Sequence, residues 1–209
     1  MTANKKYPCS CCSFLSLSDP KTGSYEICPV CFWEDDAVQN EDPYYEGGAN
    51  QVSLSVAQKN FVDFGASEQT FIPKVRPPAI TELPTISILG LEPDQIARNR
   101  EKAMIQILAV IRGVLSRQIG VIEGAPFLSS MSHYLDPEWT EELRIFRGIA
   151  SETDDLPTGT ARQFWEPHAL AQKDQEMANY ENRIRETVLQ QCRSVEGKLR
   201  NHLLGLSRQ

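Results

Sequence analysis

Two CxxC pairs near the start of the chain constrain its fold more than any other feature. Cys9 and Cys12 form the first pair, Cys28 and Cys31 form the second, and fifteen residues separate the pairs. Each pair makes a tight turn that directs two sulfurs toward one point, and the intervening loop brings the two turns face to face. This spacing predicts a structural Zn²⁺ bound by four thiolates, with no coordination position left open for catalysis.

Two alternatives for these cysteines stay open. The four thiols could instead form two disulfides, and Cys11, which lies between two presumed ligands, could replace Cys12 at the metal. The segment from Met1 to Lys6 is polar, and no segment has the composition of a signal peptide or a transmembrane helix. We therefore expect a cytoplasmic protein without a membrane partner, in a reducing compartment where paired CxxC motifs bind metal and disulfides are rare.

Negative charge is concentrated in the first third of the chain. Up to Ile72 there are four basic and ten acidic residues, so this part carries −6 of the total net charge of −7. Nucleic-acid binding requires the opposite balance, because Lys and Arg make the phosphate contacts. The charge therefore argues against a nucleic-acid partner and favours a basic protein partner, although an acidic surface also serves solubility alone.

The cysteine-rich part reads as a small α+β module that covers residues 1–72. Short β-prone runs at 14–17 and 24–27 flank a turn at 19–23, which predicts a β-hairpin between the two cysteine pairs. Ser53 is a candidate N-cap for a helix that ends at Gly65.

The rest of the chain reads as helical. Five prolines between Pro73 and Pro93 predict a semi-extended connector over 73–93, because proline lacks the backbone donor. Residues 94–209 then form a helical domain with two long helices, over 93–118 and 166–204, and a short helix near 137–146. The predicted fold class is α+β overall and mainly α, with a small zinc-ribbon module and its β-hairpin followed by this helical domain.

Two polar clusters are candidates for contact with a partner. The first is Glu34, Asp35 and Asp36, which follows the second cysteine pair and otherwise reads as a solvated loop. The second cluster contains Glu152, Asp154 and Asp155, followed by Arg162, Trp165 and His168. Its alternative interpretation is the start of a helix, because acidic residues interact favourably with the positive end of the helix dipole.

Catalysis has little support in the sequence. The second polar cluster would form an enzyme site only if its side chains converged on a concave surface. The three histidines are widely separated, and no phosphate-binding or nucleophile motif is present. We therefore expect that the protein is not an enzyme.

Four stretches of the N-terminal third share one pattern: residues 7–12, 25–36, 47–50 and 52–58. In these stretches the N-terminal third resembles the bacterial cysteine-rich CPCC family. The sequence departs from the family pattern at Ser10, where the family usually has Pro, and at Ser13, where such a turn often has Gly, but it keeps all four ligands. In the stretches 112–113, 120–124 and 151–157, the remainder resembles an uncharacterised bacterial helical domain linked to toxin-immunity loci.

This resemblance implies a role in polymorphic toxin systems. Together with the acidity, it predicts a cytoplasmic immunity protein that neutralises a cognate toxin by direct binding and occlusion of its active site. The expected toxin is a basic, nuclease-like protein, because nucleases present basic clefts. The alternative is a zinc-ribbon adaptor or a nucleic-acid-associated regulator. The predicted contact residues are Glu34, Asp35, Asp36, Glu152, Asp154 and Asp155.

Overall fold

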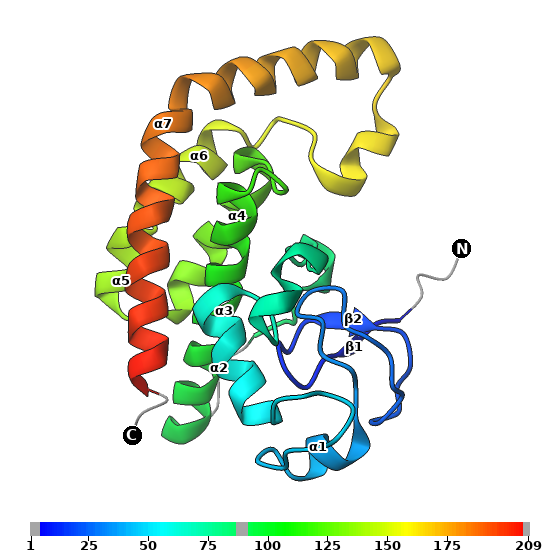
Figure 1. The fold of residues 1–209 in the computed structure, drawn as a ribbon. Helices are drawn as coiled ribbons and strands as arrows, with labels where there is room; N and C mark the ends of the chain where they lie inside the picture. The colour runs from blue at the N-terminus through cyan, green and yellow to red at the C-terminus, as the bar shows by residue number, and fades with distance from the viewer. Residues whose placement is uncertain (1–4, 87–91, 207–209) are drawn as a thin grey trace. The chain divides into compact units, whose positions relative to one another are not determined.

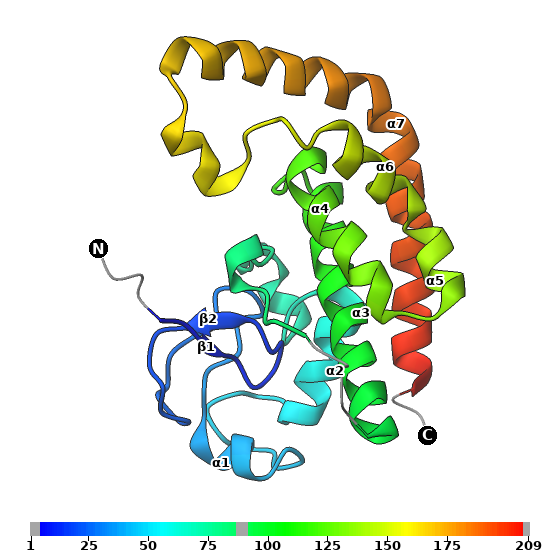
Figure 2. The ribbon, with the colours of Figure 1, turned by 180° about the vertical axis from the view of Figure 1, so that it is seen from behind.

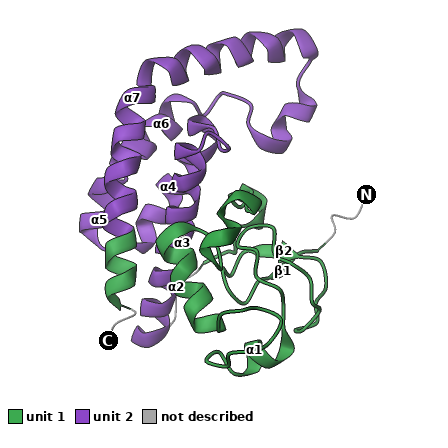
Figure 3. Ribbon diagram, viewed as in Figure 1, with its two compact units in different colours: residues 1–86, 200–209 green, residues 87–199 purple. Residues whose placement is uncertain are grey.

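A computed structural model describes residues 5–86 and 92–206 of the chain. Its contacts divide the chain into two compact units, of which unit 1 comprises residues 1–86 and 200–209 and unit 2 comprises residues 87–199 (Figure 3). The fold is mainly helical, with a small pair of antiparallel strands near the N-terminus, as the sequence predicts. The predicted domain borders at 72 and 93 stay predictions; residues 73–86 group with unit 1, and residues 87–91 of the proposed connector lie outside the described part.

The strand pairing in unit 1 differs from the predicted hairpin. Strand β2 (Leu15–Leu17) pairs with β1 (Tyr7–Pro8), which lies before the first cysteine pair, and does not pair with residues 24–27. Around the second cysteine pair, Ile27 and Glu34 form an isolated antiparallel bridge. The prediction of strands 14–17 and 24–27 as partners was wrong because each CxxC turn reverses the chain by itself. Each turn therefore pairs the residues on its own two sides.

Two helices and two 3₁₀ segments complete the first 86 residues of unit 1. Helix α2 (Leu54–Phe64) ends at Gly65, whose φ of +87° gives the left-handed cap that favours glycine, so the predicted helix is confirmed. Ser53 occupies the N-cap position, but its side chain makes no capping hydrogen bond. The other elements are helix α1 (Ala37–Glu41) and the 3₁₀ segments η1 (Gln69–Lys74) and η2 (Ile80–Glu82).

The core of unit 1 joins the cysteine turns to helix α2. Phe14, which follows the first turn, is buried and meets Phe61 of α2 edge-on, with ring centroids 5.9 Å apart. Trp33, which follows the second turn, is fully buried. Large aromatic side chains supply the apolar area that so small a core needs.

Unit 2 is built from helices packed around the apolar half of α3 (Pro93–Leu115). That half is buried nearly all round, as the sequence predicts, and α4 (Val121–Met131) packs against both α3 and α6. Helix α4 was not predicted, because Gly124 and Pro126 interrupt its pattern. The remaining short elements are η3 (Ser132–Tyr134), α5 (Pro137–Glu142), α6 (Arg144–Glu152) and η4 (Gly159–Phe164).

The last helix, α7 (Pro167–Leu206), confirms the second long helix of the sequence and bends part-way along its length (Figures 1 and 2). Its apolar stripe is buried only from Val188 onward, whereas Leu170, Met177 and Tyr180 before the bend stay partly exposed. In the described part of the chain, no helix combines the length and the apolar character needed to cross a membrane.

Candidate metal centre

The two cysteine pairs form two turns of matching geometry. In the first, the carbonyl of Cys9 accepts from the N–H of Ser13 at 2.8 Å, and the N–H of Cys9 donates to Phe14 at 2.9 Å. In the second, Cys28 makes the equivalent bonds to Phe32 and Trp33, at 2.8 and 2.9 Å. The residue that follows each pair lies in the left-handed region, with φ of +66° at Ser13 and +65° at Phe32. Each turn thus directs its two thiols to one side.

The four thiols meet in one buried cluster. The sulfurs of Cys9, Cys12, Cys28 and Cys31 all lie within 4.8 Å of one another, and the Cys9–Cys31 and Cys12–Cys28 sulfur pairs are 3.6 and 3.7 Å apart. Zn–S bonds of about 2.3 Å in a tetrahedron would separate the sulfurs by about 3.8 Å. The donor set and its dimensions therefore fit a metal ion. All six cysteines of the chain are free thiols in the structure.

The surroundings of the cluster also favour a cation. Burial raises the pKa of the Cys12 and Cys31 thiols, whereas hydrogen bonds from the neighbouring thiols, led by that of Cys12, lower the pKa of Cys28. The Cys28 sulfur also lies 3.1 Å from the hydroxyl of Ser16 and accepts from the N–H of Val30 at 3.4 Å. Several thiolates this close together and out of water require a positive charge between them.

Cys11 lies beside the cluster and outside the group of four. It is buried, and it interacts with the Cys31 side chain, but its sulfur is not among the four that gather within 4.8 Å. This placement agrees with the interpretation of Cys11 as a spare thiol next to the site.

Asp35 and Asp36 hold the chain that follows the second turn. One carboxylate oxygen of Asp35 accepts from the N–H groups of Gly23 and Ser24 at 2.8 and 2.9 Å. These two bonds connect the loop between the cysteine pairs to the chain that follows the second turn. Asp36 caps α1 by accepting from Val38 at 2.8 Å. Both side chains are buried, at 3% and 6% exposure, so a role in partner contact, which stays a prediction, would fall to Glu34 among these three acids.

Gln39 and Asn50 form a polar core under the loop that follows α1. Gln39 is fully buried, and its amide donates to the carbonyl of Val52 at 3.0 Å and accepts from the Asn50 side chain at 2.9 Å. The Asn50 side chain also bonds both the N–H and the carbonyl of Glu34, at 2.9 Å each. A side chain on Gly48 would come within 2.6 Å of Gln39, so only glycine fits there. This network was not predicted from the sequence, where residues 47–50 were named only as part of the family pattern.

A second anchor ties the proline-rich segment to the cysteine module. Arg76 and Glu82 form a bidentate ion pair with two bonds of 2.7 Å, and the backbone N–H of Arg76 donates to the carbonyl of Pro29 inside the second CxxC pair. Sequence reasoning missed this pair, because an arginine and a glutamate six residues apart do not form a recognisable motif.

The second polar cluster is spread over several local contacts. Glu152 accepts from the hydroxyl of Tyr180 at 2.8 Å, Asp155 pairs with Lys173 at 2.5 Å, and Arg162 pairs with Asp174 on α7 at 2.7 Å. Glu152 lines a groove between α6 and α7, but none of the other members of this cluster does. Asp154 and Asp155 are exposed. The structure thus places Glu152 in a contact between α6 and α7 and Asp155 in an ion pair with Lys173 of α7, and it does not gather these acids around one point.

The fold and the site together define a zinc-ribbon-like module with a four-thiol cluster, followed by helices. Residues 7–82 match the family model described as Cysteine-rich CPCC, which supports this family for the module. The matched segment includes both cysteine turns, the Gln39–Asn50 network and the Arg76–Glu82 pair. Comparison of the chain with curated proteins gave no match, and comparison with solved structures gave none either.

Proposed function

We propose that this protein is an immunity protein that binds a cognate toxin and occludes its active site, with a structural Zn²⁺ at the four-thiol cluster. Zinc suits a closed tetrahedral set of four thiolates and brings no redox chemistry of its own. In this proposal the metal holds unit 1 in shape, and the surface of unit 1 makes the contact.

The acidic–aromatic loop of residues 41–48 carries the proposal. Every residue of this loop is exposed, and Tyr44 is 79% exposed. The loop contains three acids, Glu41, Asp42 and Glu46, and no basic residue. Exposed tyrosines within a region of one charge sign are typical of protein-binding surfaces, because the aromatic ring supplies affinity and the charge accelerates association.

The loop is also preorganised. The N–H of Tyr44 donates to the Asp42 carboxylate at 3.0 Å, the N–H of Ser55 donates to the carbonyl of Pro43 at 2.9 Å, and Gln39 lies beneath the loop. A loop that is already ordered loses little conformational entropy on binding. A basic cleft of the nuclease type is the complementary partner, and Glu34 is a further candidate contact on unit 1.

The test is co-expression with the protein encoded by the neighbouring gene, followed by pull-down and by titration of the purified pair. We expect growth to be restored and a complex whose affinity falls as ionic strength rises. Tyr44→Ala combined with Asp42→Lys should weaken the complex at least tenfold. Glu186→Lys, an exposed site on α7, makes a charge change of the same size and should leave the affinity within twofold.

Two results would contradict the proposal. One is a neighbouring product that neither binds this protein nor is neutralised by it. The other is salt-sensitive binding of DNA or RNA to the isolated protein, which would favour the alternative of a nucleic-acid-associated regulator. The charge of −6 up to Ile72 opposes that alternative.

A further inference from the structure

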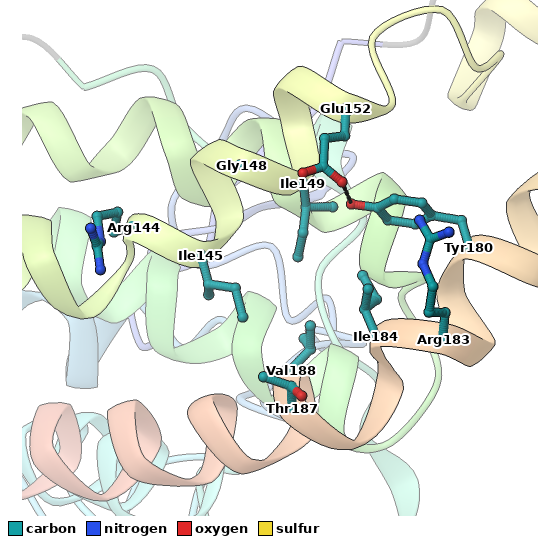
Figure 4. A pocket seen from close by; sticks show the side chains of 10 residues that line it. All are labelled: Arg144, Ile145, Gly148, Ile149, Glu152, Tyr180, Arg183, Ile184, Thr187 and Val188. Carbon is teal, nitrogen blue, oxygen red and sulfur yellow. Dashed lines mark hydrogen bonds between the residues drawn. The ribbon is translucent and has the colours of Figure 1, made fainter.

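A groove lies between α6 and α7 in unit 2. It encloses about 580 Å³, and four aliphatic side chains form its floor (Figure 4). The groove opens to solvent along one side, so it cannot enclose a small molecule as a buried ligand pocket does. Its shape suits a side chain that projects from another protein surface. The floor consists of Ile145 and Ile149 from α6 and of Ile184 and Val188 from α7.

Gly148 keeps the groove open. It lies in the middle of α6, where glycine is less favourable than alanine by roughly 0.5–1 kcal/mol. A Cβ placed on Gly148 would meet no atom within 4 Å, so packing inside the chain does not require glycine at this position. The missing side chain leaves space above the floor.

One end of the groove is closed by a polar contact and carries two opposite charges, the carboxylate of Glu152 and the guanidinium of Arg183. The hydroxyl of Tyr180 donates to Glu152 at 2.8 Å and so ties α7 to α6. The guanidinium of Arg183 lies 5.1 Å from the centre of the Tyr180 ring (Figure 4). Within residues 5–86 and 92–206, Arg183 has no carboxylate partner, so its charge is available to an acidic group from outside.

The same unit carries an aromatic pair of which one ring is largely exposed and the other partly exposed. Phe164, at the end of η4, is 83% exposed, the highest value among the large apolar side chains in the described part of the chain, and Trp165 beside it is 37% exposed. Glu166 follows directly, is exposed, and forms no ion pair within the described residues. Arg162 and Asp174 join η4 to α7 through two bonds of 2.7 and 2.9 Å, which fix the position of this aromatic tip.

We propose that the groove of one copy receives the aromatic tip, residues 164–166, of a second copy. Phe164 and Trp165 would cover the aliphatic floor, and Glu166 would meet Arg183. If the two contacts are reciprocal, they close a two-fold dimer and growth stops at two copies. This inference is independent of the proposed function.

The area available predicts a weak dimer. An aromatic side chain buries about 150–250 Å² at most, and Phe164 and Trp165 are 83% and 37% exposed, so each tip can bury about 180–300 Å². Two reciprocal contacts, with the groove surface counted, then bury about 700–1,200 Å². Stable interfaces bury about 1,200 Å² or more, and smaller ones belong to transient complexes. We therefore expect a monomer–dimer equilibrium that depends on protein concentration.

Sedimentation equilibrium of the full chain tests the proposal. The wild-type mass should rise toward twice the monomer mass as concentration rises and should not exceed it. Phe164→Ala and Gly148→Leu should each weaken the dimer at least tenfold. Two matched controls should leave it unchanged: Gly197→Leu, at another helical glycine with open space around it, and Tyr44→Ala, at another exposed aromatic residue.

Mixing the two variants gives a sharper test. The Gly148→Leu chain keeps its aromatic tip and the Phe164→Ala chain keeps its groove, so an equimolar mixture should regain part of the dimer that each lacks alone. Arg183→Glu should weaken the dimer, and adding Glu166→Arg should restore it. A wild-type chain that stays monomeric, a dimer that survives Gly148→Leu, or a mixture without recovery would each overturn the proposal.

Discussion

Ser13 and Phe32 occupy the same place in their turns, and both have a positive φ that strains any residue with a side chain. The strain is compensated at Phe32 but not at Ser13. The Phe32 ring stacks on Phe71 with centroids 4.4 Å apart, and the ammonium group of Lys74 lies 4.9 Å from the Phe32 ring. Ser13 is exposed, and no comparable ring contact compensates for the strain at this position.

Ser13→Gly should therefore raise the free energy of unfolding by roughly 0.5–1 kcal/mol, because glycine adopts the left-handed region without strain. The measurement is the urea midpoint of the metal-loaded protein. Phe32→Gly is the matched variant and should lower the midpoint, since it removes the stacked ring. A Ser13→Gly variant with a lower midpoint would contradict this account of the turn.

The Arg76–Glu82 pair predicts a pH dependence. Burial alone raises the pKa of Glu82, but the hydrogen bond from Arg76, the N–H of Ala79 and the Arg76 charge outweigh it and lower the pKa. A carboxyl with a lowered pKa stabilises the folded chain above its unfolded pKa of about 4.3, and this contribution disappears as the pH falls through the folded value. Glu82→Gln should thus cost about 1–3 kcal/mol at neutral pH.

The free energies of unfolding of Glu82→Gln and of the wild type, measured by denaturation over a pH series, should draw together as the pH falls below the unfolded pKa of about 4.3 and converge below the lowered pKa of folded Glu82. If the difference in free energy of unfolding between the two proteins grew toward acid pH, a group other than Glu82 would be responsible for the pH dependence.

Acidic residues were the hardest to place from the sequence. Glu34, Asp35 and Asp36 read as one exposed patch, but two of them are buried because backbone N–H groups converge on their carboxylates. Those donors come from segments up to thirteen residues away, such as Ala49, and only the folded loops bring them together. The cysteine ligands could be identified because their spacing is itself the geometric constraint.

At the scale of elements, the helices whose ends are marked in the sequence by proline or glycine begin or end in the structure where they were predicted to. Pro93 at the start of α3 and Gly65 after α2 mark termini by their own backbone chemistry. Helix α4 lacked such signals, and Pro126 within it argued against a helix. The apolar period of α7 predicted one continuous stripe. In the structure only the part of the stripe after the bend is buried. The period alone could not show this, because it does not tell whether another element covers the stripe.

Because only part of α7 is buried, the same Leu→Ala change should lower the free energy of unfolding by different amounts on the two sides of the bend. Leu199→Ala, at a fully buried position, should lower the free energy of unfolding by about 2–5 kcal/mol. Leu170→Ala, at a partly exposed position before the bend, should lower it by less than about 1 kcal/mol. Thermal and urea denaturation of the two variants will measure the difference, and equal losses would refute the division.

At the scale of the whole molecule, the four-thiol cluster lies in unit 1 and the central helix α3 lies in unit 2. Stability supplied by a metal should therefore be unevenly distributed. A structural site contributes its binding free energy to the folding of the part that contains it.

Cys28→Ser, or removal of metal with a chelator, should unfold most of residues 5–86 and leave the helices of unit 2 largely intact. Hydrogen exchange should show lost protection in the cysteine module, circular dichroism should retain most of the helical signal, and metal analysis should give about one Zn²⁺ per wild-type chain and none in the variant. Cys192→Ser serves as control, because Cys192 lies on the buried stripe of α7 and is not among the four thiols of the cluster. A Cys28→Ser chain that keeps its metal and its protection would refute the four-thiolate site.

The two matching turns have a consequence for the loop that joins them. Each turn supplies half of the donor set, so loading the site closes a ring of chain between Cys12 and Cys28. The entropy of closing such a ring grows only with the logarithm of its length, and doubling the loop costs about 0.6 kcal/mol. The metal itself would therefore accept a much longer loop, and the bonds that the N–H groups of Gly23 and Ser24 donate to Asp35 are what hold the present loop in place.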